Sequence, residues 1–527
     1  MRIYYPTTGP AGAPELRLDQ LEAIYRIKRE ITEPGYTKSV LVGAGMGSGK
    51  TVVSVEVILK TDPRRCLIVG VRDAFGQWAK SYFEQGGTRE FLRIDNTPAG
   101  QANLASLLAG DEGIFYIGLE MLRAQDWKKV SETYVVPDDK YTAKWGITPG
   151  VREQVTIKHL HTYSDMDPVD LLISDEAHKH SNQKSKSIET METIPAVAKI
   201  ALSGTFFGNQ FINAWSLTTW LWGKPVIGTK GAFEKNFCNV ARIMSKSGKP
   251  VTTPGGFPLS KVTGEKNPGE FVDTLPCYVF IATPLGPVPR PEIVKVELTK
   301  EQQRQYDEME KQSLTWLRTE TGVKTPLVAD LPVTQRQRLR TAALGGMTIV
   351  PGATSDDPDS IKFLPGAKSA TLNAAYDVLH RPSWEGKKAL ILTHSKQFAI
   401  EAARRIGTKY TVALKTGDTK PKVWDDEKAR FMMDVSETDS IQYLVAVISA
   451  VGTATDGLQY NCAKVLWLSE DDNNVNNIQG GNRVWRDGVD LAEYEAVEIV
   501  SKRTISEDVR NKNMTHALSV LASVKGL

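Results

Sequence analysis

The sequence lacks several features that would place the protein in a specialised class. Its 527 residues hold only four cysteines and no Cys-x-x-Cys pair, which argues against a zinc knuckle or a disulfide framework. No uninterrupted apolar run approaches about 18 residues, and the first residues contain no apolar signal core. We therefore expect no membrane association and a reducing cytoplasmic location. The formal net charge of +3 neither requires nor excludes nucleic acid.

The sequence contains two series of short apolar runs that alternate with amphipathic stretches, the pattern of βα units on a parallel sheet. The first series predicts a helix at 51–59 and strands at 39–42, 66–71, 114–118, 171–174 and 199–203. The second series predicts a terminal helix at 507–524 and strands at 389–393, 444–448, 465–468 and 496–500. An α/β fold of two similar lobes, joined by an irregular bridge, follows from this pattern.

Three regions are expected along the chain. Residues 1–222 form the N-terminal lobe, and 124–168 form a loop-rich insertion within it. Residues 223–370 form an irregular basic insertion and bridging segment, since they are rich in Gly, Pro, Lys and Thr over their first half. Residues 371–527 form the C-terminal lobe.

A glycine-rich stretch from Gly43 to Thr51 lies between a predicted strand and a predicted helix, the context that a phosphate loop requires. Small residues let backbone N–H groups turn towards a phosphate, and the helix N-terminus adds partial positive charge. Lys50 would reach the β- and γ-phosphates of ATP, and Thr51 would supply a hydroxyl ligand to Mg²⁺. The residues predicted to contact the nucleotide are Ala44, Gly45, Met46, Gly47, Ser48, Gly49, Lys50 and Thr51.

Two carboxylates, Asp175 and Glu176, follow the predicted strand at 171–174. Ligands of parallel sheets bind at the carboxyl ends of the strands, so an acid pair at this position indicates a metal and water site. Asp175 would hold Mg²⁺ through water, and Glu176 would orient and deprotonate the attacking water.

Arg483 and Arg486 are three residues apart, and on a helix they would share one face. An arginine directed at the γ-phosphoryl group neutralises charge that develops in the transition state, which is worth roughly 10³–10⁵ in rate. We therefore predict that both are catalytic, acting from the second lobe across an ATP cleft between the lobes. Gln20 precedes the phosphate loop, where a side-chain amide could read the adenine edge; an exposed helix glutamine is the alternative.

The order of these motifs resembles helicase superfamily two, and specifically its Swi/Snf-type branch of DNA translocases in a compact bacterial or phage form. The motifs that carry the resemblance are the phosphate loop, Gln77-Trp78, Asp175-Glu176-Ala177-His178, Gly204-Thr205, and Gln479 through Arg486. The segment Asp456-Gly457-Leu458-Gln459 matches only loosely, which leaves the DNA contacts of the second lobe open.

The resemblance implies two RecA-like lobes, ATP and Mg²⁺ as cofactors, a DEAH-type box at 175–178, and double-stranded DNA as partner, with single-stranded DNA as a further candidate. It implies that His178 and Thr205 couple the nucleotide state to DNA contact, that Gln77 and Trp78 lie along a DNA strand, and that Gln479 lies at the nucleotide. The resemblance also implies a location in a bacterial or phage-infected host cytoplasm. It further implies a protein partner in replication, recombination or repair.

Residues 224–266 carry eight Lys/Arg against two Glu. Lys246, Lys249 and Lys261 are the predicted phosphate-tracking residues, with Arg336, Arg338 and Arg340 as additions. A solvated loop without a partner is the alternative.

We expect a DNA-stimulated ATPase that translocates along duplex DNA and remodels DNA or protein–DNA complexes. Two alternatives remain open at this stage. The first is a strand-separating helicase of the same superfamily, whose wedge could involve Tyr141 and Trp145. The second is an ATP-gated DNA clamp without processive movement.

Overall fold

The computed structural model describes most of the chain, and the descriptions below refer to these residues. The described residues are 15–45, 47–136, 150–159, 163–182, 185–204, 211–243, 249–252, 260–286, 288–318, 324–329, 332–350, 360–363, 369–451, 455 and 457–525. They divide into two compact units, one with residues 15–45 and Gly49–Ala282, the other with residues 47–48 and Thr283–Lys525. Among the described residues, no helix combines the length and apolar character needed to cross a membrane.

The first unit is built on a seven-stranded parallel sheet with the strand order β11-β1-β8-β7-β2-β4-β3. Its strands are β1 (Ser39–Ala44), β2 (Arg65–Gly70), β3 (Phe91–Ile94), β4 (Gly113–Gly118), β7 (Val169–Ser174), β8 (Ala196–Ser203) and β11 (Tyr278–Ile281). β1, β2 and β4 are buried at every position, as expected for apolar strands covered on both faces. The five strands predicted for this lobe are confirmed, whereas β3 and β11 were not predicted.

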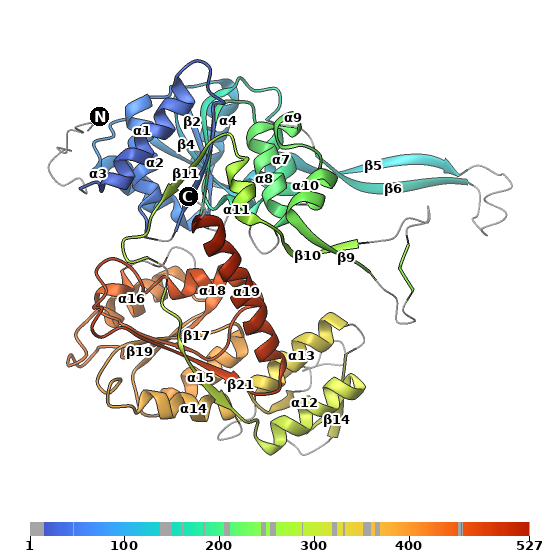
Figure 1. Ribbon diagram of the computed structural model, residues 1–527, viewed down its shortest axis with the longest axis vertical. Helices are drawn as coiled ribbons and strands as arrows, with labels where there is room; N and C mark the ends of the chain where they lie inside the picture. The colour runs from blue at the N-terminus through green and yellow to red at the C-terminus, as the bar shows by residue number, and fades with distance from the viewer. Residues whose placement is uncertain are drawn as a thin grey trace. The chain divides into compact units, whose positions relative to one another are not determined.

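Helices cover both faces of this sheet. They are α1 (Leu18–Thr32), α2 (Lys50–Thr61), α3 (Phe75–Glu84), α4 (Pro98–Ala109), α5 (Leu119–Asp126), α7 (Lys186–Thr193) and α8 (Ile212–Trp222). Figure 1 shows α1, α2 and α3 on one side of the sheet and α7 and α8 on the other. Ile24, Val53 and Trp78, one from each of the first three helices, share a core cluster with Ile68 of β2.

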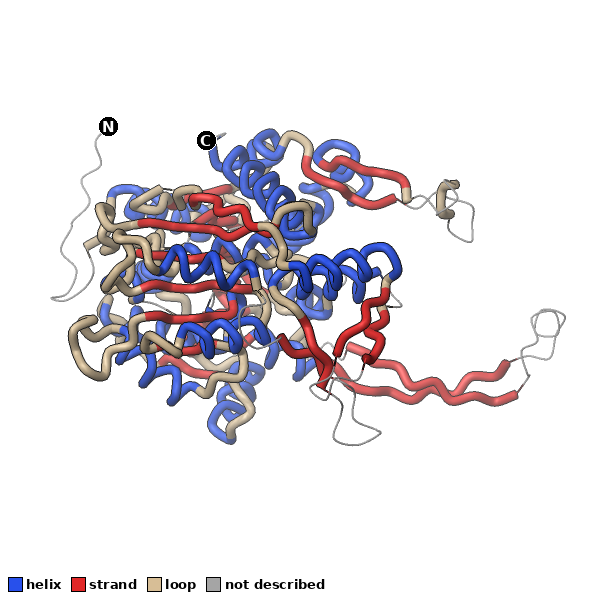
Figure 2. The backbone as a smooth tube through the Cα atoms, turned by 90° about the horizontal axis from the view of Figure 1, so that it is seen from below, coloured by secondary structure: helices blue, strands red, loops and turns tan. Residues whose placement is uncertain are grey.

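The insertion at 124–168, expected as loops, contains a regular antiparallel ribbon. β5 (Trp127–Val136) pairs with β6 (Gly150–His159) over ten residue pairs, from Trp127 opposite His159 to Val136 opposite Gly150. Figure 2 shows this ribbon leaving the parallel sheet of its own unit. The loop expectation is therefore wrong for these strands, because their alternating polar and β-branched residues suit an extended ribbon. Tyr141 and Trp145 lie outside the described residues.

The remainder of the first unit is also more ordered than its composition suggested. It contains α9 (Lys224–Ile227), α10 (Lys230–Phe237), the antiparallel pair β9 (Cys238–Arg242) and β10 (Ser260–Glu265), and α11 (Pro268–Asp273). The rings of Phe211, Phe233, Phe237 and Phe271 pack against one another at centroid distances of 5.1–5.7 Å. This aromatic cluster gives the segment a core of its own.

The second unit is built on a six-stranded parallel sheet with the order β12-β21-β20-β17-β19-β18. Its strands are β12 (Glu292–Val296), β17 (Ala389–Thr393), β18 (Val412–Lys415), β19 (Tyr443–Val447), β20 (Lys464–Trp467) and β21 (Glu495–Ser501). Its helices are α14 (Ala370–Leu379), α15 (Lys396–Ile406), α16 (Pro421–Phe431), α17 (Ile448–Val451), α18 (Asn474–Gly481) and α19 (Ile505–Lys525). The predicted α/β fold with two parallel-sheet lobes is thus confirmed.

The expected bridge at 223–370 is divided between the two units. β11 completes the first sheet beside β1, and β12 completes the second beside β21. Between β12 and α14 the chain forms α12 (Lys300–Gln312), β13 (Leu314–Arg318), β14 (Lys324–Val328), α13 (Pro332–Leu344), β15 (Met347–Val350) and β16 (Ser360–Phe363). These elements enclose a separate apolar cluster that includes Tyr306, Met309 and Leu339. The pairing partners of β11 and β12 are distant in sequence, so composition did not reveal them.

Candidate nucleotide-binding site

The phosphate loop connects β1 to α2, as the sequence predicted. Gly47 and Gly49 adopt φ angles of 78° and 85°, a left-handed conformation that glycine accepts without steric cost. Gly49 is the residue before the first turn of α2, so the loop turns sharply into the helix. Ser48 is fully buried and Thr51 almost fully. The backbone therefore has the strand–turn–helix form that directs N–H groups at a phosphate.

Lys50 lies against the two predicted carboxylates. Its Nζ forms an ion pair with Glu176 and lies 3.8 Å from Asp175 Oδ1. This arrangement places the end of β7 next to the start of α2. Lys50 and Glu176 are 126 positions apart in the sequence, yet the phosphate loop and the acid pair form one site.

Burial and charge act differently on the two carboxylates. Burial raises the pKa of Asp175, although the Lys50 ammonium opposes the shift. Burial alone would also raise the pKa of Glu176, but the Lys50 ammonium beside it holds the pKa at about 2. Glu176 is thus ionised in this structure. Its backbone has φ 49°, a left-handed conformation that is uncommon outside glycine and that turns its side chain back towards Lys50.

The histidine of the acidic box also faces the site. His178 Nδ1 lies 3.0 Å from Ser203 Oγ at the end of β8 and 3.4 Å from Glu176 Oε2. Burial lowers the pKa of His178 to about 4, so the ring is neutral near pH 7. His178 therefore links the acid pair to the segment that begins at Gly204. Thr205, the predicted coupling partner, lies outside the described residues.

Gln20 reaches the phosphate loop from α1. A Cβ placed on Gly49 would lie 2.2 Å from Gln20 Nε2, so the amide packs directly on that glycine. Gln20 Oε1 accepts the backbone N–H of Arg17 at 2.9 Å, which forms half of a helix capping box. Gln20 is buried, so the exposed-helix alternative is wrong.

Gln77 and Trp78, the two residues predicted to lie along a DNA strand, differ in burial. Gln77 is exposed on α3, whereas Trp78 is fully buried. The indole Nε1 of Trp78 donates a hydrogen bond to Asp175 Oδ2 at 3.0 Å. The buried ring has no surface to offer DNA, while the expectation that the backbone of this segment lies along a DNA strand stays a prediction. The amphipathic period of α3 turns this position inward.

In the second unit, Gln479 lies buried on α18, but Arg483 and Arg486 lie beyond the helix end at Gly481. The expectation that the arginines share a helix face is therefore wrong. Gly480 and Gly481 disfavour helix by about 1 kcal/mol each relative to alanine, and the chain continues as turns. Arg483 is buried and its Nη1 donates to the Thr455 carbonyl, whereas Arg486 is partly exposed and its Nε donates to the Asn482 carbonyl at 2.6 Å.

The three lysines predicted to track phosphates are only partly described. Lys249 is exposed, β10 includes Lys261, and Lys246 lies outside the described residues. Their role stays a prediction.

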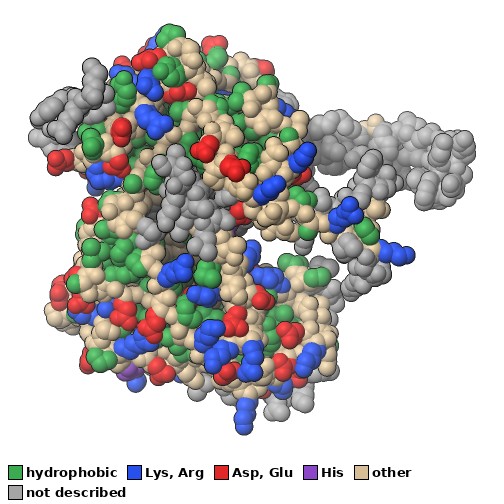
Figure 3. Space-filling view, in the orientation of Figure 1, with side chains coloured by type: hydrophobic (Ala, Val, Ile, Leu, Met, Phe, Trp, Pro, Cys, Tyr) green, Lys and Arg blue, Asp and Glu red, His purple; other side chains and the backbone are tan. Residues whose placement is uncertain are grey.

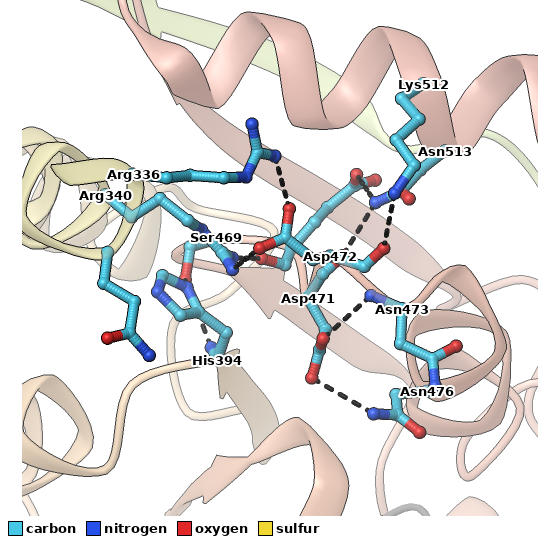
Figure 4. Close-up of polar contacts among 12 residues, drawn as sticks. Arg336, Arg340, His394, Ser469, Asp471, Asp472, Asn473, Asn476, Lys512 and Asn513 are labelled. Carbon is cyan, nitrogen blue, oxygen red and sulfur yellow. Dashed lines mark hydrogen bonds and ion pairs between the residues drawn. The ribbon is translucent and has the colours of Figure 1, made fainter. Parts of the chain in front are cut away.

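Arg336 and Arg340, suggested as further DNA contacts, instead form ion pairs with a carboxylate in their own unit. Arg336 Nη2 and Arg340 Nη1 donate to the two oxygens of Asp472 at 2.6 and 2.5 Å, as the dashed lines in Figure 4 show. Arg340 Nη2 also donates to the Glu470 carbonyl. On the face drawn in Figure 3, basic and acidic side chains alternate over this unit. Both arginines stabilise the connection between β20 and α18, so this structure does not support them as DNA contacts.

The fold and the site together have the form of a phosphate-loop nucleotide-binding domain on a parallel sheet. Residues 13–208 match the family model described as type III restriction enzyme, res subunit. The matched stretch contains the phosphate loop and the Asp175-Glu176 pair, the two motifs with which the predicted resemblance to helicase superfamily two begins.

The chain is also similar to a curated protein and to a solved structure. A stretch of 93 residues, 18% of this chain, is 32% identical to the DNA excision repair protein ERCC-6-like of Bos taurus. That stretch spans 8% of the bovine protein's length. The Sulfolobus solfataricus SWI2/SNF2 ATPase core, solved in complex with dsDNA, is 13% identical and has a TM-score of 0.38, with 98% of this chain and 96% of that chain covered.

The residues present fit a magnesium ion bound together with a nucleotide. Lys50 is the ammonium that lies against both carboxylates, Asp175 and Glu176. Thr51 and Asp175 supply oxygen donors, which Mg²⁺ prefers. Among the described residues no group of three or more acidic, histidine or cysteine side chains could cage a metal alone.

Proposed function

We propose that the chain is a DNA-dependent ATPase that translocates along double-stranded DNA and couples ATP hydrolysis to remodelling of DNA or protein–DNA complexes. The observation that carries the ATPase part is the contact of Lys50 with Asp175 and Glu176 at the phosphate loop. A lysine that bridges the loop and the acid pair stands where the β- and γ-phosphates, the metal and the attacking water meet in phosphoryl transfer.

ATP binding would exchange the partners of Lys50. The phosphates compete with Glu176 for the ammonium, since they carry more negative charge than one carboxylate. Release of Glu176 frees its carboxylate to accept a hydrogen bond from the attacking water as general base. Thr51 and Asp175 would hold Mg²⁺, which, when bound, neutralises charge on the phosphate oxygens.

Of the two arginines, Arg486 is the better candidate for contact with the γ-phosphoryl group. Its guanidinium is partly exposed, whereas that of Arg483 is buried and donates to the Thr455 carbonyl. Arg483 then fixes the turn that presents Arg486, and Gln479 supports the same segment from α18. Gln20, packed on Gly49, is suited to hold the adenine end.

The preference for duplex DNA rests on the resemblance of the motifs to Swi/Snf-type translocases, which also suggests a compact bacterial or phage protein. The surplus of Lys/Arg at 224–266 would supply phosphate contacts. His178 contacts both Glu176 and Ser203, so it would couple a change at the nucleotide to the position of the segment after Gly204.

Displacement of a triplex-forming strand tests movement along duplex DNA. The chain should displace a third strand placed far from its loading site, with ATP but not with a non-hydrolysable analogue. The triplex lies in an intact duplex, so displacement requires tracking and not strand separation. DNA-stimulated hydrolysis without displacement at any distance would favour the ATP-gated clamp instead.

One observation favours the strand-separating helicase as a second candidate. The β5–β6 ribbon, with ten residues in each strand, extends from the first unit where only a loop was expected. A protruding antiparallel ribbon is suited to stand between two strands. Robust unwinding of a forked duplex, lost when residues 130–156 are replaced by a short Gly/Ser linker, would move the protein to this class.

A further inference from the structure

We infer that Trp78 is a positioning residue that orients the Asp175 carboxylate for the bound metal ion, an inference that rests on the proposed ATPase function. Trp78 lies on α3 and has no exposed surface. Its Nε1 donates to Asp175 Oδ2 at 3.0 Å. The motif resemblance places the backbone of this segment along a DNA strand, and the buried indole faces Asp175.

The hydrogen bonds of Asp175 fix the direction of its carboxylate. Oδ1 accepts the backbone N–H of Glu176 at 2.9 Å, while Oδ2 accepts the indole N–H of Trp78. Lys50 lies farther away, 3.8 Å from Oδ1, and an ammonium attracts without fixing an angle. The N–H of Glu176 belongs to the neighbouring backbone, and Lys50 fixes no angle. The indole of Trp78, which comes from α3, therefore sets the rotation of the carboxylate.

The indole is itself held rigidly. Trp78 belongs to the core cluster that includes Ile68, Tyr116 and Ile173, so its ring cannot rotate without disturbing the sheet. The hydroxyl of Tyr116 donates to the Val71 carbonyl at 2.6 Å and does not compete for Asp175. If ATP draws Lys50 towards its phosphates, the Trp78 hydrogen bond remains as a fixed support of Asp175.

Replacement of Trp78 by phenylalanine removes the donor and keeps an aromatic ring. Binding of a fluorescent ADP analogue would be measured against Mg²⁺ concentration and, separately, in EDTA. We expect the Mg²⁺ concentration for half-maximal binding to rise at least about tenfold, because partners of metal ligands typically contribute 10–100-fold. Affinity in EDTA should stay unchanged, since the phosphate loop is intact. A purely structural role of Trp78 would weaken binding in both conditions equally.

Trp220→Phe is the matched control. Trp220 is buried in the same unit, and its Nε1 donates to the Met191 carbonyl at 3.1 Å and not to a carboxylate. This variant should keep the wild-type Mg²⁺ requirement. If Trp78→Phe does not fold, β-(3-benzothienyl)alanine at position 78 keeps the bicyclic shape and removes only the N–H donor.

An unchanged Mg²⁺ requirement in a folded Trp78 variant would overturn the inference. The result is distinguishable from failure of the proposed function. A wild-type chain that binds ADP with Mg²⁺ but never hydrolyses ATP would contradict the ATPase proposal, while the binding titration would still decide the role of Trp78.

Discussion

The Lys50→Ala chain is expected to lose ATP hydrolysis almost completely, and Glu176→Gln is expected to lose it while retaining ATP. Without the ammonium, the β- and γ-phosphates lose the lysine that neutralises part of their charge and holds them in place. The glutamine keeps the shape of Glu176 but cannot accept a proton from the attacking water. Steady-state phosphate release and filter binding of labelled ATP measure the two effects side by side.

The Lys50 variant also leaves two buried carboxylates without their cation, so its folding must be compared with that of the wild type by thermal melting. Lys199→Ala is a suitable control, because Lys199 is partly buried in the same unit and donates to the Trp220 carbonyl. Its turnover should match the wild type. Wild-type turnover by Glu176→Gln would contradict the assignment of the general base.

Arg486→Ala is expected to reduce kcat by about 10³-fold or more, with little change in ATP affinity, because an arginine finger acts mainly in the transition state. Arg483→Ala should also lower kcat but should in addition lower the melting temperature, since its side chain is buried against the Thr455 carbonyl. Single-turnover hydrolysis with equilibrium nucleotide binding separates these contributions.

Arg404→Ala serves as the control for Arg486. Arg404 is in the same unit, on α15, and pairs with Glu401 three residues away at the surface. Exposed pairs of this kind contribute little to stability, so this variant should behave as the wild type. If Arg486→Ala lost ATP affinity but kept turnover at saturating ATP, Arg486 would be a ground-state binding residue instead.

The parallel sheets and the phosphate loop could be predicted because their signals are local. β1, β7 and β17 are continuous runs of buried apolar residues, and Gly47 and Gly49 mark the turn into α2. The acid pair after β7 also followed from position, since carboxyl ends of parallel strands gather at one edge of a sheet.

The remaining features depend on contacts between residues that are distant in sequence. The pairing of β11 with β1 brings Tyr278 beside Leu41, and no local pattern indicates this partner. Trp78 belongs to a helix whose other face is exposed, so only the fold shows that its indole meets Asp175. The glycine pair before Asn482 did carry a usable signal for the end of α18.

The most direct test is ATP turnover by the purified chain in Mg²⁺ without DNA, with single-stranded DNA, and with duplex DNA of equal length. We predict low basal turnover, stimulation by both DNAs, and a clearly higher rate with duplex DNA. An ATP turnover rate that does not change when DNA is added, or that rises only with single-stranded DNA, would contradict a motor that acts on double-stranded DNA.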